Sequence, residues 1–277
     1  MDSLKKKELM KKATDVRIGI IEGVHAAKSG HPGGSLSIAE ILTYLYFEYM
    51  NIDPENPKDE NRDRFVLSKG HAAPALYSVL ANRGYFDVSE LKTLRHIGSF
   101  LQGHPDMKHI PGVDMSSGSL GQGISAACGM ALSAKHFKNN FKVITVLGDG
   151  EIEEGQVWEA AMFAGNKGLD NLTAFIDLNN LQIDGTIDEV NSAKPVDKKF
   201  EAFNWHTITI DGHDFEQIEA ALKEAETVNK PVAIIANTIK GKGVSFMENQ
   251  VSWHGSAPND EQYEIAMNEL KAYKAAL

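Results

Sequence analysis

The stretch that decides the fold reads FKVITVLGDG over residues 141–150 and LTAFIDLNN over residues 172–180. Residues 141–147 and 172–178 are apolar runs rich in β-branched side chains, which is typical of buried strands. Between them, residues 156–167 (QVWEAAMFAGNK) have helical spacing, with small apolar side chains on one face. A strand, a helix and a second strand in this order predict a right-handed parallel crossover. We therefore expect an α/β fold, a doubly wound and mostly parallel sheet flanked by helices.

Asp149 and Asn179 directly follow the two strands of this crossover. Because neighbouring parallel strands end at the same edge of a sheet, a carboxylate and an amide oxygen are expected to meet there, beside a helix N-terminus. Mg²⁺ takes oxygen ligands, and the N–H groups of a helix start bind phosphate. Gly148-Asp149-Gly150 alone is more often only a turn. The pair Asn179-Asn180 after the next strand makes a magnesium diphosphate site the better hypothesis.

Length and composition narrow the class of protein. The chain has 277 residues, 42% of them hydrophobic, which is enough for one large or two small domains. A net charge of −10 disfavours nucleic acid and anionic membranes as the main partners. The single cysteine, Cys128, is expected to be a buried, inert thiol. The N-terminal residues lack the apolar core of a signal peptide, and no apolar run is long enough to span a bilayer, so we expect a cytoplasmic protein.

The remaining elements follow from periodicity and breaker residues. Glycines and a proline interrupt the helical pattern at residues 29–34, and Ser89 is the expected N-cap of a short helix. The long aperiodic segment 98–119 is expected to be functional. We expect one domain over residues 1–277 with a helical N-terminal extension. Helices are expected at residues 2–28, near residue 37 onward, and at 72–83, 89–95, 124–136, 215–228 and 259–277, and further strands at 65–67, 206–210 and 232–236.

Residues 118–123 (GSLGQG) have the spacing of a dinucleotide-binding fingerprint. That motif requires a strand directly before its glycines, and residues 113–117 (VDMSS) make a poor strand. NAD binding is therefore disfavoured. Residues 240–243 (KGKG) to 253–255 (WHG) form a second expected ligand loop.

Four histidines lie in short glycine-containing breaks: His31, His71, His104 and His254. A single histidine in a turn is usually solvated, but four in such breaks favour a role. Glycine lets the backbone approach a ligand, and imidazole exchanges protons near neutral pH. No role is expected for the other histidines, which are His25, His96, His109, His136, His206 and His213.

The GDG–NN stretch resembles the diphosphate-binding motif of thiamine diphosphate enzymes. In that family the aspartate, the asparagine and a main-chain carbonyl two residues further on hold magnesium, which implies Asp149, Asn179 and Leu181 as metal ligands. The histidine breaks narrow the resemblance to transketolase, whose motifs occur here in order: SGHPG at 29–33, KGH at 69–71, GHP at 103–105, GSLGQG at 118–123 and SWHG at 252–255.

The resemblance implies a role for each matched position. The cofactor diphosphate would lie near His71 and His254. Gly118, Ser119, Leu120 and Gly150 would line the same site, with Asn179 and Glu154 among the cofactor-binding residues and Ile183 against the thiazolium. His31, His104 and His254 would contact the sugar hydroxyls and aid proton transfer. Glu154 and Glu159 would belong to a carboxylate network between two active sites. Ser119 stands where many transketolases have proline.

Only the first transketolase domain is matched. The family also needs a pyrimidine-binding domain, whose glutamate activates the cofactor and whose arginines grip the sugar phosphate, and a C-terminal domain. The resemblance therefore implies the N-terminal subunit of a split transketolase that moves a two-carbon ketol group between sugar phosphates. Its partner would carry both missing domains in an α2β2 assembly. The alternatives are a subunit of another two-chain thiamine diphosphate enzyme, acting on an unusual ketose phosphate or a 2-oxoacid, and a non-catalytic cofactor-binding subunit.

Overall fold

A computed structural model describes all 277 residues, and its centre is a five-stranded sheet. The strands are β1 (Arg64–Leu67), β2 (Val143–Gly148), β3 (Leu172–Leu178), β6 (His206–Asp211) and β7 (Val232–Asn237). They lie in the order β1-β2-β3-β7-β6, and every neighbouring pair is parallel. The crossover β2–α6–β3 places β2 and β3 side by side, with Gly148 opposite Asp177. The predicted parallel α/β fold is confirmed.

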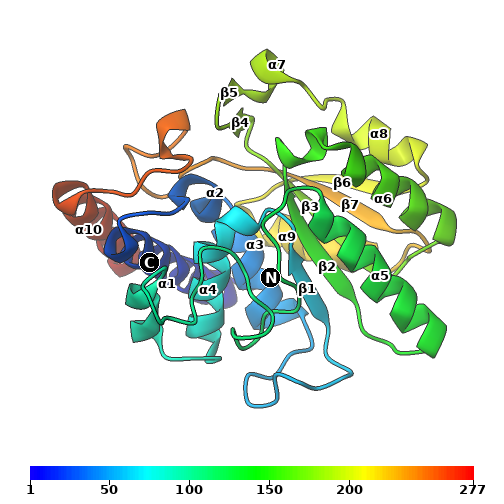
Figure 1. The fold of residues 1–277 in the computed structure, drawn as a ribbon, viewed down its shortest axis with the longest axis horizontal. Coiled ribbons are helices and arrows are strands. Elements are labelled where there is room, and N and C mark those ends of the chain that lie inside the picture. Colours follow the sequence, from blue (N-terminus) through cyan, green and yellow to red (C-terminus); the bar gives the residue numbers. More distant parts are fainter.

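Helices cover both faces of the sheet (Figure 1). On one face lie α5 (Gln122–Phe137), α6 (Gly155–Lys167) and α8 (Val196–Ala202), and α5 packs directly on α6. On the other lie α1 (Ser3–Ala27), α3 (Ala39–Tyr44), α4 (Ala73–Arg83) and α9 (Phe215–Ala225). Strand side chains alternate between the two cores, so Phe65 and Leu67 join one core while Val66 joins the other. Two packed cores hold the sheet rigid between them.

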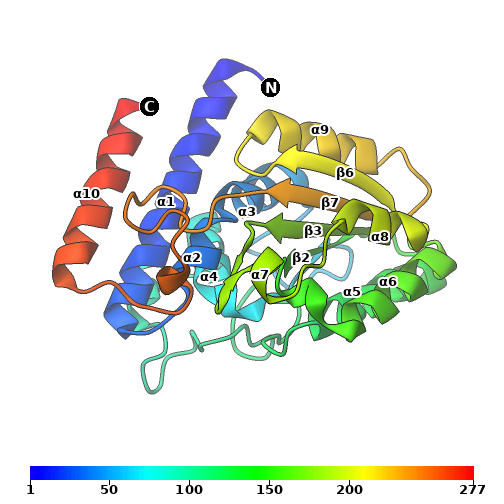
Figure 2. The same cartoon turned by 90° about the horizontal axis from the view of Figure 1, so that it is seen from above.

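The two terminal helices lie next to each other. Helix α10 (Asp260–Ala276) packs along α1, and Figure 2 shows the two side by side at one end of the sheet. Leu9 and Ile20 of α1 and Met267 and Leu270 of α10 are buried in the larger core. The expected N-terminal helix is therefore part of the packed structure.

Several local predictions were wrong in detail. The break expected at residues 29–34 contains the start of helix α2 (Pro32–Leu36), since proline fits the first turn of a helix. A π-helical turn, Leu45–Tyr49, extends α3. The helix expected at 89–95 is a 3₁₀ helix, Val88–Thr93, and its N-cap is Asp87 instead of Ser89. Asp87 Oδ1 accepts hydrogen bonds from the Ser89 N–H and hydroxyl, so the acid one residue earlier takes the capping position.

Small elements around the carboxyl edge of the sheet were not predicted from the sequence. They are the hairpin β4 (Leu181–Gln182) and β5 (Gly185–Thr186), helix α7 (Ile187–Val190), and the 3₁₀ turns Gly70–Ala72, Glu151–Glu153 and Val251–Trp253. Helix α8, which directly precedes β6, was also not predicted. Helix α7 has a capping box between Thr186 and Glu189.

Cys128 is buried between α5 and α6, and burial raises the pKa of its thiol to about 12. The expectation of an inert thiol agrees with this environment. None of the helices combines the length and the apolar character that crossing a membrane demands.

Candidate active site

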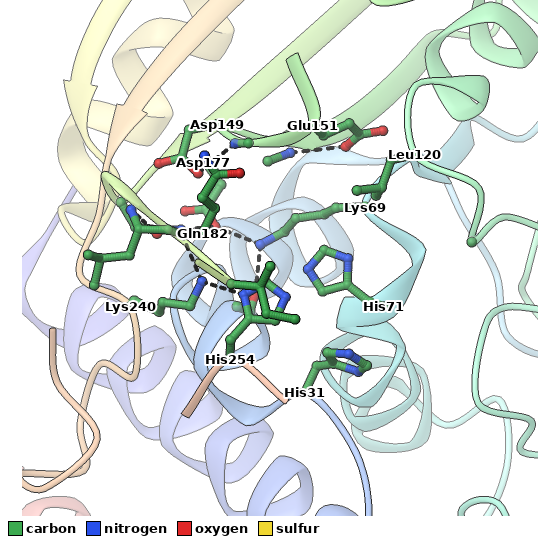
Figure 3. Close-up of a pocket in the computed structure, with 17 residues that line it drawn as sticks. His31, Lys69, His71, Leu120, Asp149, Glu151, Asp177, Gln182, Lys240 and His254 are labelled. Atoms are coloured by element: carbon green, nitrogen blue, oxygen red, sulfur yellow. Dashed lines mark hydrogen bonds and ion pairs between the residues drawn. The ribbon is translucent and has the colours of Figure 1, made fainter. Parts of the chain in front are cut away.

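A cavity of about 310 Å³ opens at the carboxyl edge of the sheet, where β1, β2, β3 and β7 end (Figure 3). Parallel α/β sheets bind ligands at this edge. Ten residues singled out from the sequence line the cavity: His31, His71, Gly118, Leu120, Asp149, Gly150, Asn179, Leu181, Ile183 and His254.

Asp149 is the first polar residue after β2, and its side chain is buried. Its Oδ1 accepts a hydrogen bond from the Gly150 N–H at 2.9 Å, and its Oδ2 accepts one from the Asn180 N–H at 2.5 Å. Burial and the neighbouring Asp177 carboxylate raise its pKa. A cation beside Asp149 would relieve this penalty.

Asn179 is oriented by its neighbours on β3. Its Nδ2 donates to Asp177 Oδ2 at 3.0 Å, while its Oδ1 accepts from the Leu181 N–H at 3.1 Å. Asp177 is fully buried and also accepts from Lys69 Nζ at 2.6 Å and Ser37 Oγ at 2.7 Å. Burial alone would raise the pKa of Asp177, but the Lys69 ammonium and the hydrogen bonds from Thr238 and Ser37 together outweigh it, and the pKa is lowered. The ionised Asp177 therefore fixes which way the Asn179 amide faces.

Lys240 brings a second ammonium group into the cavity. Its Nζ donates to the Leu181 carbonyl at 2.9 Å and lies 2.9 Å from His254 Nδ1. The side chain is 2% exposed, and burial lowers its pKa. A positive charge thus already contacts one of the three oxygens expected to bind magnesium.

The donor set of this cavity fits Mg²⁺. A carboxylate (Asp149), an amide oxygen (Asn179) and a main-chain carbonyl (Leu181) converge here, and magnesium is commonly held by one or two carboxylates plus the phosphate oxygens of its ligand. The chain contains no group of three or more His, Cys, Asp or Glu side chains arranged to hold a metal ion. A metal in this cavity would therefore depend on amide, main-chain and ligand oxygens.

Three of the four singled-out histidines form a cluster. The ring centroids lie 5.2 Å apart for His31 and His71, 5.3 Å for His71 and His254, and 5.7 Å for His31 and His254. Burial lowers the pKa of His31 to about 4, that of His254 to about 3, and that of His71 well below its ordinary value. Nearby lysines and Arg95 add to the shift. The imidazoles are therefore neutral at pH 7, and Nδ1 of His31 is buried without a partner.

Glycines let the loops close around this cluster. A Cβ on Gly70 would lie 2.6 Å from the Gly118 nitrogen, so the turn after β1 and the 118–121 loop touch through their backbones. Gly118 has φ +148°, and a Cβ there would lie 3.0 Å from the His104 ring. Both motifs therefore need glycine at these positions, because a side chain on Gly70 or Gly118 would collide with the neighbouring loop.

Glu151, which was not predicted from the sequence, ties three loops of the cavity together. Its carboxylate accepts from Ser68 Oγ at 2.5 Å, from the Gly121 N–H at 2.9 Å and from the Gly148 N–H at 3.0 Å. Burial raises the pKa of this carboxyl. The other lining residues without a predicted role are Gly34, Lys69, Gly148, Asp177, Gln182 and Lys240.

Three of these additional cavity residues are charged, and the sequence alone marks them as unusual. Asp177 is a lone acid inside the apolar run LTAFIDL, and Lys69 and Lys240 lie in motifs already marked by glycines. A charge at a position that must be buried indicates a partner or a ligand. Which groups pair could be read only from the structure.

Three predicted residues do not line the cavity, namely His104, Ser119 and Glu154. All three are exposed. The ring of His104 packs near Gly118, and the stem of Glu154 lies beside Gly121. Glu159 of α6 is also exposed. The roles expected for these residues stay predictions.

The fold is a parallel α/β domain. At the carboxyl edge of its sheet, one cavity contains both oxygen atoms that can bind a cation and lysine and histidine side chains that can bind an anion. Residues 9–273 match the family described as "Transketolase, thiamine diphosphate binding domain". The chain belongs to this transketolase family.

Some relatives of this chain have about its own length, and others are more than twice as long. The 6-deoxy-6-sulfo-D-fructose transketolase subunit SqwG of Clostridium sp. (strain MSTE9) is 48% identical over 95% of this chain and 96% of that protein. One subunit of the apulose-4-phosphate transketolase of Phocaeicola vulgatus is 43% identical over 91% of this chain and 89% of its own length. Mouse transketolase is 46% identical over 97% of this chain, but this chain spans only 43% of it.

Solved structures of transketolases share the fold. The Campylobacter jejuni enzyme superposes with a TM-score of 0.89 at 34% identity, over 95% of this chain and 43% of that chain. The Pichia stipitis enzyme in complex with sedoheptulose-7-phosphate superposes with a TM-score of 0.91 at 34% identity, over 97% of this chain and 41% of that one. This chain therefore corresponds to less than half of each solved enzyme.

Proposed function

We propose that this chain is the diphosphate-binding subunit of a two-chain transketolase. With a partner that carries the pyrimidine-binding and C-terminal domains, in an α2β2 assembly, it would transfer a two-carbon ketol group from a ketose phosphate to an aldose phosphate. The observation that carries the proposal is the meeting of Asp149, Asn179 and the Leu181 carbonyl beside the His31–His71–His254 cluster in one cavity.

The residues of the cavity divide the work of holding the cofactor. Asp149, Asn179 and the Leu181 carbonyl would bind Mg²⁺, while His71, His254 and Lys240 would face the diphosphate as donors. The metal would replace Lys240 as the partner of the Leu181 carbonyl, and the Lys240 ammonium would then bind phosphate oxygens. Ile183 and Leu120 would lie against the apolar ring. When bound, thiamine diphosphate supplies the carbanion chemistry, and the protein binds and orients it.

The neutral histidines suit a sugar substrate. A neutral imidazole both donates and accepts hydrogen bonds, so His31 can contact a hydroxyl through its unpartnered Nδ1. His31 and His254 together would bind sugar hydroxyls and move protons between them and the reacting carbon. His104, exposed beside Gly118, would join them at the mouth of the cavity.

A partner chain is supported by two observations. The relatives that match along 96% and 89% of their own length are both named as subunits. Ile183 is 63% exposed and Leu120 is 36% exposed, although both line the cavity. Large apolar side chains at the mouth of a polar cavity favour a covering chain. That chain would supply the activating glutamate and the groups that grip the sugar phosphate.

An unusual ketose that carries a phosphate or a sulfonate is the second candidate substrate. Relatives named for 6-deoxy-6-sulfo-D-fructose and apulose-4-phosphate are as similar to this chain as the mouse transketolase. Because the groups that would grip the phosphate belong to the partner, the donor sugar is best identified by assay. The histidine cluster disfavours a 2-oxoacid donor.

Calorimetric titration with thiamine diphosphate tests the proposed cofactor site directly. In the presence of Mg²⁺ we expect saturable binding, which EDTA and the substitution Asp149→Ala each abolish. Asp188→Ala, at an exposed residue paired with Lys194, serves as the matched control and keeps the wild-type affinity. An Asp149→Ala variant with unchanged affinity would refute the assigned site.

A further inference from the structure

A buried ionic cluster binds the loop that carries Lys240 and lies outside the cofactor cavity. Glu40 of α3 is 8% exposed and Arg17 of α1 is 4% exposed. Glu40 Oε2 accepts from Arg17 Nη2 at 2.7 Å and from His213 Nδ1 at 2.9 Å. His213 belongs to the turn between β6 and α9. One carboxylate oxygen thus joins α1, α3 and the β6–α9 turn.

The other ends of Arg17 and His213 both bind the loop after β7. His213 Nε2 accepts from the Ile239 N–H at 2.9 Å, and Arg17 Nε donates to the Lys242 carbonyl at 2.8 Å. Ile239 and Lys242 flank Lys240 in the sequence. Because Nε2 accepts a hydrogen bond here, Nδ1 is the nitrogen that donates to Glu40. The cluster therefore grips the backbone on both sides of Lys240.

The charges of the cluster indicate that it fixes the position of the loop backbone and adds little to the unfolding free energy. Burial alone would raise the pKa of Glu40, but Arg17 and His213 lower it to about 2, so the carboxylate is ionised. Buried ion pairs contribute little net stability because desolvation offsets their attraction. What such a pair does supply is a fixed geometry, here for a main-chain N–H and a main-chain carbonyl.

The gripped loop delivers one side chain to the cofactor cavity. Lys240 Nζ contacts the Leu181 carbonyl and His254, and it points into the site in Figure 3. Other contacts also hold the loop: the Gly241 N–H donates to the Gly33 carbonyl at 3.0 Å, the Asn249 N–H to the Lys240 carbonyl at 2.9 Å, and the Thr238 hydroxyl to Asp177. The cluster adds the side chains of Arg17 and His213, which bind the backbone at Lys242 and Ile239, to this support.

We propose that Arg17, Glu40 and His213 form a clamp, the Lys240 clamp, that positions the Lys240 ammonium in the cofactor cavity. They are positioning residues, since none of them lines that cavity. The link to cofactor binding rests on the proposed function, whereas the link to Lys240 does not. The two links are therefore tested separately.

Chemical labelling tests the link to Lys240 without any cofactor. Lys69 is 1% exposed and lines the same cavity, so it reports global opening. In His213→Ala we expect acetylation of Lys240, followed by peptide mass spectrometry, to accelerate about tenfold, because the part-buried Ile239 N–H loses its acceptor. Lys69 should label at the wild-type rate. Equal acceleration at both lysines, or at neither, would overturn the clamp.

Two further variants keep this test decisive. In His213→Gln the amide oxygen can replace Nε2 as the acceptor for the Ile239 N–H, so Lys240 protection should be largely restored. Asp114→Asn removes the charge of another buried pair, Asp114 with Arg62, outside the clamp. It should leave the ratio of the Lys240 and Lys69 rates unchanged even if it lowers the unfolding free energy.

A double-mutant cycle tests the link to the cofactor. We expect His213→Ala to weaken thiamine diphosphate binding about tenfold in the presence of Mg²⁺, and to have less than about a twofold effect in a Lys240→Met background. The same loss in both backgrounds would contradict positioning through Lys240. If the wild type does not bind thiamine diphosphate, the proposed function fails, and the labelling result still decides the clamp.

Discussion

The charged side chains of the cavity are lysines and acids, while its histidines stay neutral. Lys69 is paired with Asp177, Lys240 contacts the Leu181 carbonyl, and burial lowers the pKa values of His31 and His254 to about 4 and about 3. Neutral imidazoles add no positive charge that would compete with a metal ion. The site is thus arranged to receive a cation beside Asp149 and an anion beside the lysines.

Acidification should destabilise the fold through His31. Its pKa is about 4 in the folded chain and 6.5 in the unfolded one, so between these values only the unfolded chain takes up this proton. The unfolding free energy therefore falls as pH drops from about 6.5 to about 4. Urea denaturation across this range should give a shallower pH dependence for His31→Asn than for the wild type. Identical profiles would show that the ring is not held neutral.

Breaking the buried Lys69–Asp177 pair should cost far more than breaking an exposed one. Asp177→Ala leaves an unpaired ammonium in a nearly closed environment and should lower the unfolding free energy by about 3–5 kcal/mol. Asp188→Ala removes the exposed pair with Lys194 and should cost less than about 1 kcal/mol. Guanidinium denaturation measures both values. Similar losses for the two variants would contradict the assigned role of Asp177.

At the scale of elements, the β2–α6–β3 crossover could be predicted from the sequence because its periodicity is local. β3 covers Leu172–Leu178 as expected, and α6 begins one residue before the predicted Gln156. The hairpin at residues 181–186 could not be predicted. Its position depends on contacts between distant segments, such as Lys240 with the Leu181 carbonyl. Most cavity residues were predicted by motif, but the pairing of Lys69 with Asp177 was not, since no local pattern encodes it.

Two helical glycines should respond in opposite ways to alanine. A Cβ on Gly165 of α6 would lie 1.7 Å from the Phe203 carbonyl oxygen, so Gly165→Ala should lower the unfolding free energy by about 1–3 kcal/mol. Gly129 of α5 has open space around it, so Gly129→Ala should raise that free energy by about 0.5–1 kcal/mol. Chemical denaturation compares them. A neutral Gly165→Ala variant would contradict the close packing between α6 and the segment after α8.

For the whole molecule, the sheet presents its ligand residues along a single edge. Four adjacent strands end there, and two cores on opposite faces keep their ends in register. The chain spans 43% of mouse transketolase, and we propose that the other half of the catalytic apparatus comes from a partner chain. In this account Asp149 and Asn179 hold the diphosphate end of the cofactor, and the partner activates its other end.

The most direct test of that account is a ketol-transfer assay with thiamine diphosphate and Mg²⁺. A ketose phosphate and an aldose phosphate are supplied, and product formation is followed for this chain alone and after addition of a chain that carries the pyrimidine-binding and C-terminal domains. We predict no transfer by the chain alone and robust transfer by the mixture, lost again in Asp149→Ala. Robust transfer by this chain alone would contradict the account.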